Sequence, residues 1–140
     1  MNKEKLLKHL ENDIFCRVMP SKIAGVGVFA IKPIPVGANP FRERETEYMP
    51  INEEEMSNID PRVKNYIKKL FVFSDKHYWL PEQGIQTFCI THFLNHSKNP
   101  NLTTSKDADE FFATRDIREG EELTVDYDIF DELKEDFRNT

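Results

Sequence analysis

Two polar segments contain the residue types that could bind a ligand or carry out a reaction. Asn95-His96-Ser97 is followed closely by Asn99-Pro100-Asn101, and such side chains readily hydrogen-bond their own backbone, so the pattern predicts a rigid, non-helical loop. Loops of this kind position binding groups on a scaffold. The second segment, 120–127, ends in Tyr127 directly after a predicted strand. Its phenol could act at a site, or its ring could cover the core while the hydroxyl reaches water.

A third segment, Gly25-Val26-Gly27-Val28-Phe29-Ala30, matches the letters of the dinucleotide fingerprint G-x-G-x-x-G/A. In that fingerprint the glycines open a helix whose N-terminus receives a pyrophosphate. Here Pro33 and Pro35 follow, and prolines so spaced prevent a helix from continuing, so we reject this interpretation. What remains is either a tight turn between strands, or a backbone that a flat or charged ligand can approach closely because Gly25 and Gly27 have no side chains.

Cys89, His92 and His96 have the spacing C-x2-H-x3-H, which would place the two histidines one helical turn apart. Zinc could use that geometry. However, no fourth ligand is evident nearby, and apolar residues interleave with these three. We therefore favour a short buried helix with locally satisfied polar groups, and we expect no metal.

The surrounding elements indicate one β-rich α+β domain. Apolar residues at helical spacing predict a helix in the first dozen residues and another near 61–70, where Asp60 is a good N-cap and Pro61 suits the first helical position. A last helix is expected at about 131–138. Short apolar runs bounded by turn residues predict strands at 14–19, 26–31, 71–73, 77–80, 110–114 and 122–125.

Length, charge and cysteine content limit the class of protein. The 140 residues correspond to about one domain, and no apolar run approaches the ~20 residues of a bilayer span. Only two cysteines are present, which excludes a disulfide framework and favours a reducing compartment. We expect a soluble intracellular protein, cytoplasmic or nuclear. The net charge of −6 argues against direct nucleic-acid binding and favours a basic partner.

Taken in order, these segments resemble the SET domain of protein-lysine methyltransferases. The early glycine motif of that family matches residues 25–30. Its Arg-Phe-Ile-Asn-His-Ser-Cys-x-Pro-Asn motif is met by residues 92–101, and its Gly-Glu-Glu-Leu-Thr-x-Asp-Tyr motif by residues 120–127. Lys98 replaces the cysteine of the second motif, and no Cys-rich zinc-binding tail is expected after Tyr127. In this organisation the chain is similar to compact, free-standing viral and bacterial SET proteins.

The resemblance implies an α+β, mainly β fold of small sheets and a few short helices, in which the C-terminal segment threads beneath a preceding loop as a pseudoknot. It implies an N-terminal helix over 1–13, a SET domain over 14–128 and a variable insert at 42–75. An acidic C-terminal helix over 129–140 would close a lysine channel, with Leu133 and Phe137 in its wall. Residues 121–140 contain eight acidic and two basic residues, which suits either a solvated tail or a surface for a cationic peptide.

The resemblance also implies a protein-lysine methyltransferase that uses S-adenosylmethionine, with Tyr127 as the catalytic residue. The cofactor-binding residues would be Gly25, Val26, Gly27, Asn95 and His96. The substrate channel would include Val125, Ile129 and Phe130. Many family members have Phe or Tyr where this chain has Val125, so the number of methyl groups added is left open.

The expected partner is a basic, lysine-containing segment of a histone or another protein, with no membrane partner and with a homodimer left open. Two alternatives remain at this stage. One is a catalytically silent SET module that binds a basic peptide without modifying it. The other is a zinc-binding interaction module that uses Cys89, His92 and His96.

Overall fold

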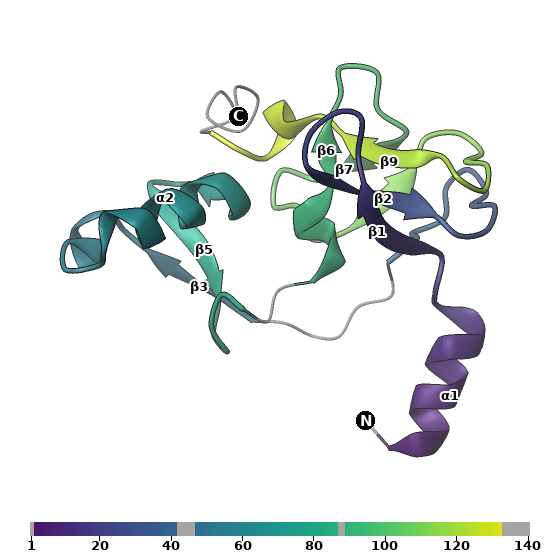
Figure 1. Ribbon diagram of the computed structural model, residues 1–140, viewed down its shortest axis with the longest axis horizontal. Coiled ribbons are helices and arrows are strands. Elements are labelled where there is room, and N and C mark those ends of the chain that lie inside the picture. Colours follow the sequence, from purple (N-terminus) through teal and green to yellow (C-terminus); the bar gives the residue numbers. More distant parts are fainter. Residues whose placement is uncertain (1, 42–46, 87–88, 133–140) are drawn as a thin grey trace.

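Two groups of secondary-structure elements lie beside each other in the computed structural model, which describes residues 2–41, 47–86 and 89–132 (Figure 1). The larger group, the core, contains a four-stranded and a two-stranded sheet. The smaller group, the inserted lobe, comprises residues 47–86 and contains a three-stranded sheet covered by one helix. The fold is therefore mainly β, with small sheets and few short helices, as the sequence predicts.

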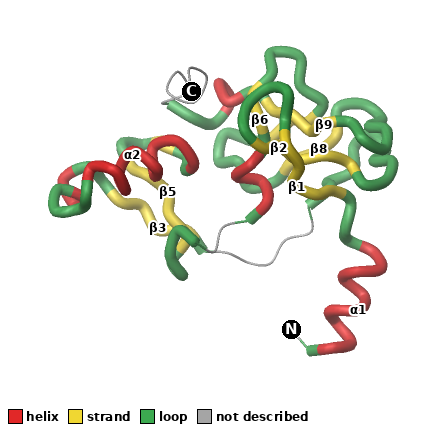
Figure 2. The backbone as a smooth tube through the Cα atoms, in the orientation of Figure 1, coloured by secondary structure: helices red, strands yellow, loops and turns green. Residues whose placement is uncertain are grey.

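The four-stranded sheet brings together segments that are far apart in the sequence (Figure 2). Its strands are β1 (Cys16–Pro20), β2 (Val26–Ala30), β9 (Glu122–Val125) and β6 (Asn95–His96), in that spatial order. β2 pairs with β1 and with β9 in antiparallel fashion, while β6 runs parallel to β9 with His96 opposite Val125. The last two motifs of the sequence analysis are therefore adjacent strands of one sheet.

The two-stranded sheet closes the other side of the core. It pairs β7 (Leu102–Thr104) with β8 (Phe111–Ala113) in antiparallel register. Between the two sheets lie apolar side chains that are completely excluded from solvent, among them Val28, Leu102, Leu123 and Val125. Burial of these side chains stabilises the platform from which the polar loop 95–101 extends.

The inserted lobe has a small core of its own. It contains β3 (Tyr48–Ile51), η1 (Glu54–Met56), α2 (Pro61–Leu70), β4 (Phe73–Ser74) and β5 (His77–Pro81). α2 begins as predicted: the Asp60 side chain accepts a hydrogen bond from the Arg62 amide, and Pro61 occupies the first helical position. Four buried side chains, Met56, Ile67, Phe71 and Tyr78, pack between the helix and the sheet.

The remaining helices are short or exposed. α1 (Lys3–Asn12) has no buried residue and extends away from the core (Figure 1). η2 (Ile90–Phe93) precedes β6, and η3 (Tyr127–Ile129) follows β9. Within the described residues, none of the helices has both the length and the apolar character needed to cross a membrane. The helix expected over 129–140 lies mostly outside the described residues, and Leu133 and Phe137 lie wholly outside them.

Candidate active site

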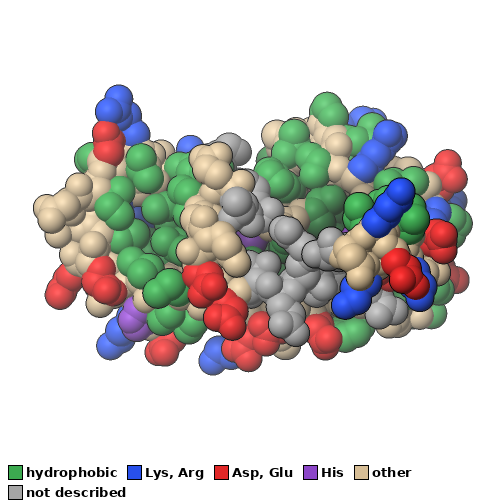
Figure 3. Space-filling view, turned by 90° about the horizontal axis from the view of Figure 1, so that it is seen from below, with side chains coloured by type: hydrophobic (Ala, Val, Ile, Leu, Met, Phe, Trp, Pro, Cys, Tyr) green, Lys and Arg blue, Asp and Glu red, His purple; other side chains and the backbone are tan. Residues whose placement is uncertain are grey.

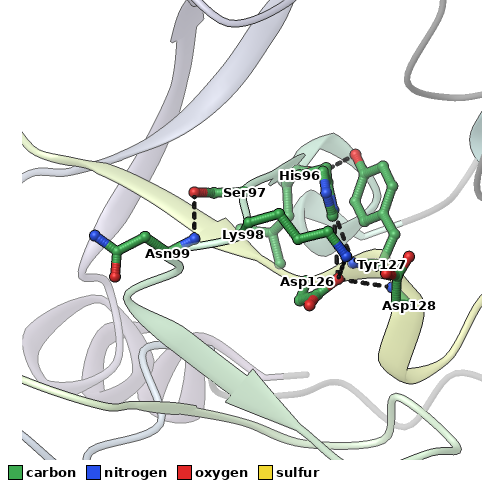
Figure 4. Close-up of polar contacts among 8 residues, drawn as sticks. His96, Ser97, Lys98, Asn99, Asp126, Tyr127 and Asp128 are labelled. Carbon is green, nitrogen blue, oxygen red and sulfur yellow. Dashed lines mark hydrogen bonds and ion pairs between the residues drawn. The ribbon is translucent and has the colours of Figure 1, made fainter.

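Tyr127 is fixed at both ends by residues of the β6 segment. Its backbone amide donates a hydrogen bond of 3.0 Å to His96 Nδ1, and its hydroxyl donates one of 2.5 Å to the carbonyl oxygen of Leu94. The two rings, His96 and Tyr127, lie 5.1 Å apart. Figure 4 shows the phenol directed back toward the strand that carries His96. The tyrosine side chain is therefore held in one position rather than exposed as a surface residue.

The end of the polar loop holds β9 in place through a buried side chain. Asn101, only 2% exposed, donates from Nδ2 to the Glu122 carbonyl and accepts at Oδ1 from the Thr124 amide, both at 2.8 Å. The Asn101 side chain thus bonds to the backbone of β9, more than twenty residues later, as a neighbouring strand would. The expectation of a non-helical loop is confirmed.

Lys98 connects the same two segments at the surface. Its ammonium group forms an ion pair with Asp128 and lies 3.7 Å from Asp126. Asp126 in turn lies 3.7 Å from His96 Nδ1. Figure 4 shows this arrangement across the start of η3. At the position where the SET motif has cysteine, this chain therefore has a cation that contacts carboxylates on both sides of Tyr127.

Asn95 lies beneath the turn that precedes β2. Its side-chain nitrogen donates toward the carbonyl oxygens of Ala24 (3.2 Å) and Val26 (3.1 Å). Gly25 has a φ of +45°, which favours glycine, and the space where its side chain would lie is open. The turn between two strands is thus confirmed, and a strand rather than a dinucleotide-binding helix follows it.

Gly27 differs from Gly25 in what lies where a side chain would be. A Cβ atom at Gly27 would collide with the Glu122 carboxylate and would lie 3.0 Å from Asn95 Nδ2. The missing side chain at Gly27 therefore makes room for the Glu122 carboxylate. Of these two glycines, only Gly25 has open space on the side where a Cβ atom would lie.

A cavity of about 360 Å³ lies between the core and the inserted lobe, and Tyr127 is in its wall. Figure 3 shows a notch in the molecular outline between the part that carries the inserted lobe, on the left, and the part that carries the core. The apolar lining of the cavity comes from both the core and the inserted lobe, and it includes Tyr48, Trp79, Leu94, Phe111 and Phe130. Three carboxylates also line it: Asp107, Asp109 and Asp131.

The comparisons with known proteins agree with this geometry. The model of the SET domain matches residues 25–128, which is most of the chain. The chain belongs to the SET domain family. The histone-lysine N-methyltransferase SUV39H1 of Xenopus laevis is 50% identical over 50 residues, a match that covers 29% of this chain and only 12% of that protein. The crystal structure of a candidate histone methyltransferase of Plasmodium falciparum has a TM-score of 0.52 at 16% identity, covering 81% of this chain and 93% of that one. This likeness confirms the fold.

Only one of the three residues predicted to line the substrate channel of this SET domain lines the cavity. Phe130 lines the cavity. Val125 is fully buried in the core and Ile129 is 37% exposed, and neither is among the cavity-lining residues. Val125 instead contributes its backbone, because its carbonyl accepts from the Ser97 amide at 3.1 Å.

The zinc-binding alternative does not fit the SET domain. Cys89 Sγ lies 2.6 Å from Thr91 Oγ1, His92 Nδ1 lies 3.1 Å from the Cys89 carbonyl, and His96 Nδ1 accepts from Tyr127. The two histidines are not on one helix, since η2 ends at Phe93 and His96 is in β6. In the three described stretches no three His, Cys, Asp or Glu side chains are grouped so that they could hold a metal ion. Burial lowers the pKa of His92, partly offset by its contact with the Cys89 carbonyl.

Proposed function

We propose that the chain is an S-adenosylmethionine-dependent protein-lysine N-methyltransferase, acting on a lysine in a basic segment of a histone or another protein. The observation that carries the proposal is the position of Tyr127, which lines the cavity while its backbone amide bonds to His96 and its hydroxyl to the Leu94 carbonyl. The short match to a histone-lysine N-methyltransferase supports the same activity.

The residues around Asn95 fit the proposed cofactor. Asn95 is 9% exposed, its side-chain nitrogen points inward to several acceptors, and no described residue donates to its Oδ1. A nearly buried acceptor of this kind suits a ligand that carries an ammonium group, because a buried polar atom is costly without a partner. The open side of Gly25 leaves room beside it. The backbone of 25–27, the Asn95 side chain and the His96 backbone would hold the cofactor.

The chemistry places most of the difficulty on the lysine. S-adenosylmethionine supplies an electrophilic methyl group on a positively charged sulfur, which leaves as a neutral thioether and needs no general acid. A lysine with a pKa of ~10.4 is neutral in only about one molecule in 2,500 at pH 7, a cost of roughly 4.6 kcal/mol. The apolar part of the cavity lining, including Leu94, Phe111 and Phe130, would favour the neutral amine by desolvation.

Tyr127 would orient that amine. Its hydroxyl proton is directed at the Leu94 carbonyl, and a hydroxyl that donates can accept at the same time. The phenol oxygen can therefore accept an N–H of the neutral amine and so align its lone pair. Because the hydroxyl proton is held by the Leu94 carbonyl, we assign the phenol a positioning and electrostatic role at the reacting atoms rather than that of a base.

The acidic side chains suit a basic peptide. Asp107 and Asp109 are exposed and line the cavity, and acidic side chains also lie along one edge of the face in Figure 3. Attraction between exposed charges is screened by salt. We therefore expect peptide affinity to fall as ionic strength rises.

Residues 129–140 would complete the channel. Phe130 and Asp131 line the cavity, and the acidic segment continues from there. Ending the chain after Asp128 should then abolish methyl transfer, whereas ending it after Glu132 tests the contribution of 133–140 alone. Full activity of the chain that ends after Asp128 would refute this part of the proposal.

The test of the activity is incubation of the purified chain with isotopically labelled cofactor and a lysine-rich protein mixture, followed by mass spectrometry. Label on lysine side chains supports the proposal and identifies the target and the methylation state. Cofactor binding without label transfer would favour the catalytically silent module. Failure to bind the cofactor would refute both.

A further inference from the structure

The carboxylate of Glu122 joins three segments beneath the turn that carries Gly25. It accepts from Ser21 Oγ at 2.7 and 2.9 Å, and its Oε2 accepts from Asn95 Nδ2 at 2.8 Å. Ser21 and Glu122 are 101 positions apart in the sequence, and Asn95 and Glu122 are 27 apart. One side chain at the start of β9 therefore links the β1–β2 turn to β6.

Ser21 extends this link into the turn itself. Because its hydroxyl proton is directed at Glu122, its oxygen is left to accept from Asn95 Nδ2 (3.0 Å) and from the Ile23 amide (2.9 Å). The Ser21 amide also donates to the Gly25 carbonyl at 2.9 Å. The conformation of residues 21–25 thus depends on a serine whose orientation is determined by Glu122.

The same contacts fix which way the Asn95 amide faces. All four groups around Nδ2 are acceptors: Ser21 Oγ, the Ala24 and Val26 carbonyls, and Glu122 Oε2. An ionised carboxylate can only accept hydrogen bonds, so the NH2 group must face Glu122 and the carbonyl oxygen must face away. Gly27 admits the carboxylate, since any side chain there would occupy its place.

We infer that Glu122 is a positioning residue of the cofactor site, acting through Ser21 and Asn95. It holds the Asn95 amide so that Oδ1 is presented as an acceptor for the ammonium group in the amino-acid part of S-adenosylmethionine. Glu122 itself need not touch the cofactor. The inference rests on the proposed function and adds to it the residue that determines how the amino-acid part is recognised.

The test compares two ligands by titration calorimetry on the full chain. S-adenosylhomocysteine contains the amino-acid part, whereas 5′-methylthioadenosine lacks it. Glu122→Gln should weaken the affinity for S-adenosylhomocysteine about tenfold, the size expected for a hydrogen bond to a charged group. Affinity for 5′-methylthioadenosine should not change. Glu121→Gln is the matched control. It removes the same charge from the neighbouring residue, whose carboxylate bonds to Arg118, and it should leave both affinities unchanged.

Ser21→Ala is a second, independent variant. It replaces Glu122→Gln in the test if the circular dichroism spectrum or melting curve of Glu122→Gln differs from that of the wild type. Equal affinities in wild type and variant for S-adenosylhomocysteine would overturn the inference, as would an equal loss for both ligands. If the wild-type chain binds neither ligand, the proposed function itself fails, which is a distinguishable result.

Discussion

The amide nitrogen of Tyr127 lies 3.0 Å from His96 Nδ1 and donates a hydrogen bond to it. That nitrogen of His96 must therefore be unprotonated, although Asp126 Oδ1 lies only 3.7 Å from it. The residues are 31 positions apart, yet this bond and the parallel pairing of β6 with β9 fix them as one unit. Movement of either segment would displace both Tyr127 and Asn95.

Tyr127→Phe should separate binding from turnover. The variant retains the ring but loses the hydroxyl that donates to the Leu94 carbonyl and that would orient the amine. We expect turnover to fall by well over tenfold, in the range of about 10²–10³-fold found when one preorganised hydrogen-bonding group is removed. Cofactor affinity should be unchanged. Single-turnover rates and calorimetry check both; wild-type turnover would remove Tyr127 from the mechanism.

Asn101→Ala should destabilise the fold. Asn101 is 2% exposed and bonds to the backbone on both sides of Leu123, so truncation removes the Asn101 partner of the buried Thr124 amide and of the partly buried Glu122 carbonyl. We expect the free energy of unfolding to drop by about 2–3 kcal/mol. Asn99→Ala, at an exposed position of the same loop, should change it by less than about 0.5 kcal/mol. Similar urea denaturation curves for the two variants would contradict the structural role.

Lys98→Met should loosen the segment that carries Tyr127 without unfolding the domain. The pair with Asp128 is at the surface, where the Lys98 side chain is 65% exposed, so the stability loss should be only about 0.5–1 kcal/mol. Hydrogen exchange at the amides of residues 127–129 should accelerate, because Asp126 and Asp128 lose the cation between them. Lys98→Arg should restore slow exchange. Lys106→Met, in the β7–β8 turn, is the control, and an equal effect there would refute the role of Lys98.

His92 should make stability depend on pH. Burial lowers its pKa in the folded state below the ordinary value of 6.5, so the unfolded chain binds the proton more readily. The contribution of the neutral, buried ring is therefore fully present above about pH 6.5 and is lost as pH falls toward the lowered pKa. Urea denaturation between pH 8 and pH 5 should show this decline, and His92→Gln should flatten it. His77→Gln, in the β4–β5 hairpin, should retain the decline.

Sequence patterns predicted the elements whose signal is local. Asp60 and Pro61 marked the start of α2, and short apolar runs marked β2 and β9. β3 was not predicted: Tyr48-Met49-Pro50-Ile51 contains a proline, which argues against a strand, and the strand forms only because it pairs with β5. Proline is tolerated there because β3 is at the edge of its sheet.

The site was predicted in part for the same reason. Asn95, His96 and Tyr127 are recognisable because they lie within continuous motifs. The i, i+4 spacing of His92 and His96 suggested a shared helix, but pairing with β9 draws His96 into a strand, so tertiary contacts override the local pattern. Glu122 and Ser21 could not be connected by spacing, since 101 positions separate them, and only the sheet brings them together.

The chain contains one tryptophan, and that residue, Trp79, lines the cavity from the inserted lobe. Its indole donates to the Ser74 carbonyl at 3.1 Å, which limits its freedom to rotate. Intrinsic fluorescence from this single indole therefore reports on cavity occupancy without any added dye. Peptides can therefore be screened for binding by the change in emission they cause, without a catalytic assay.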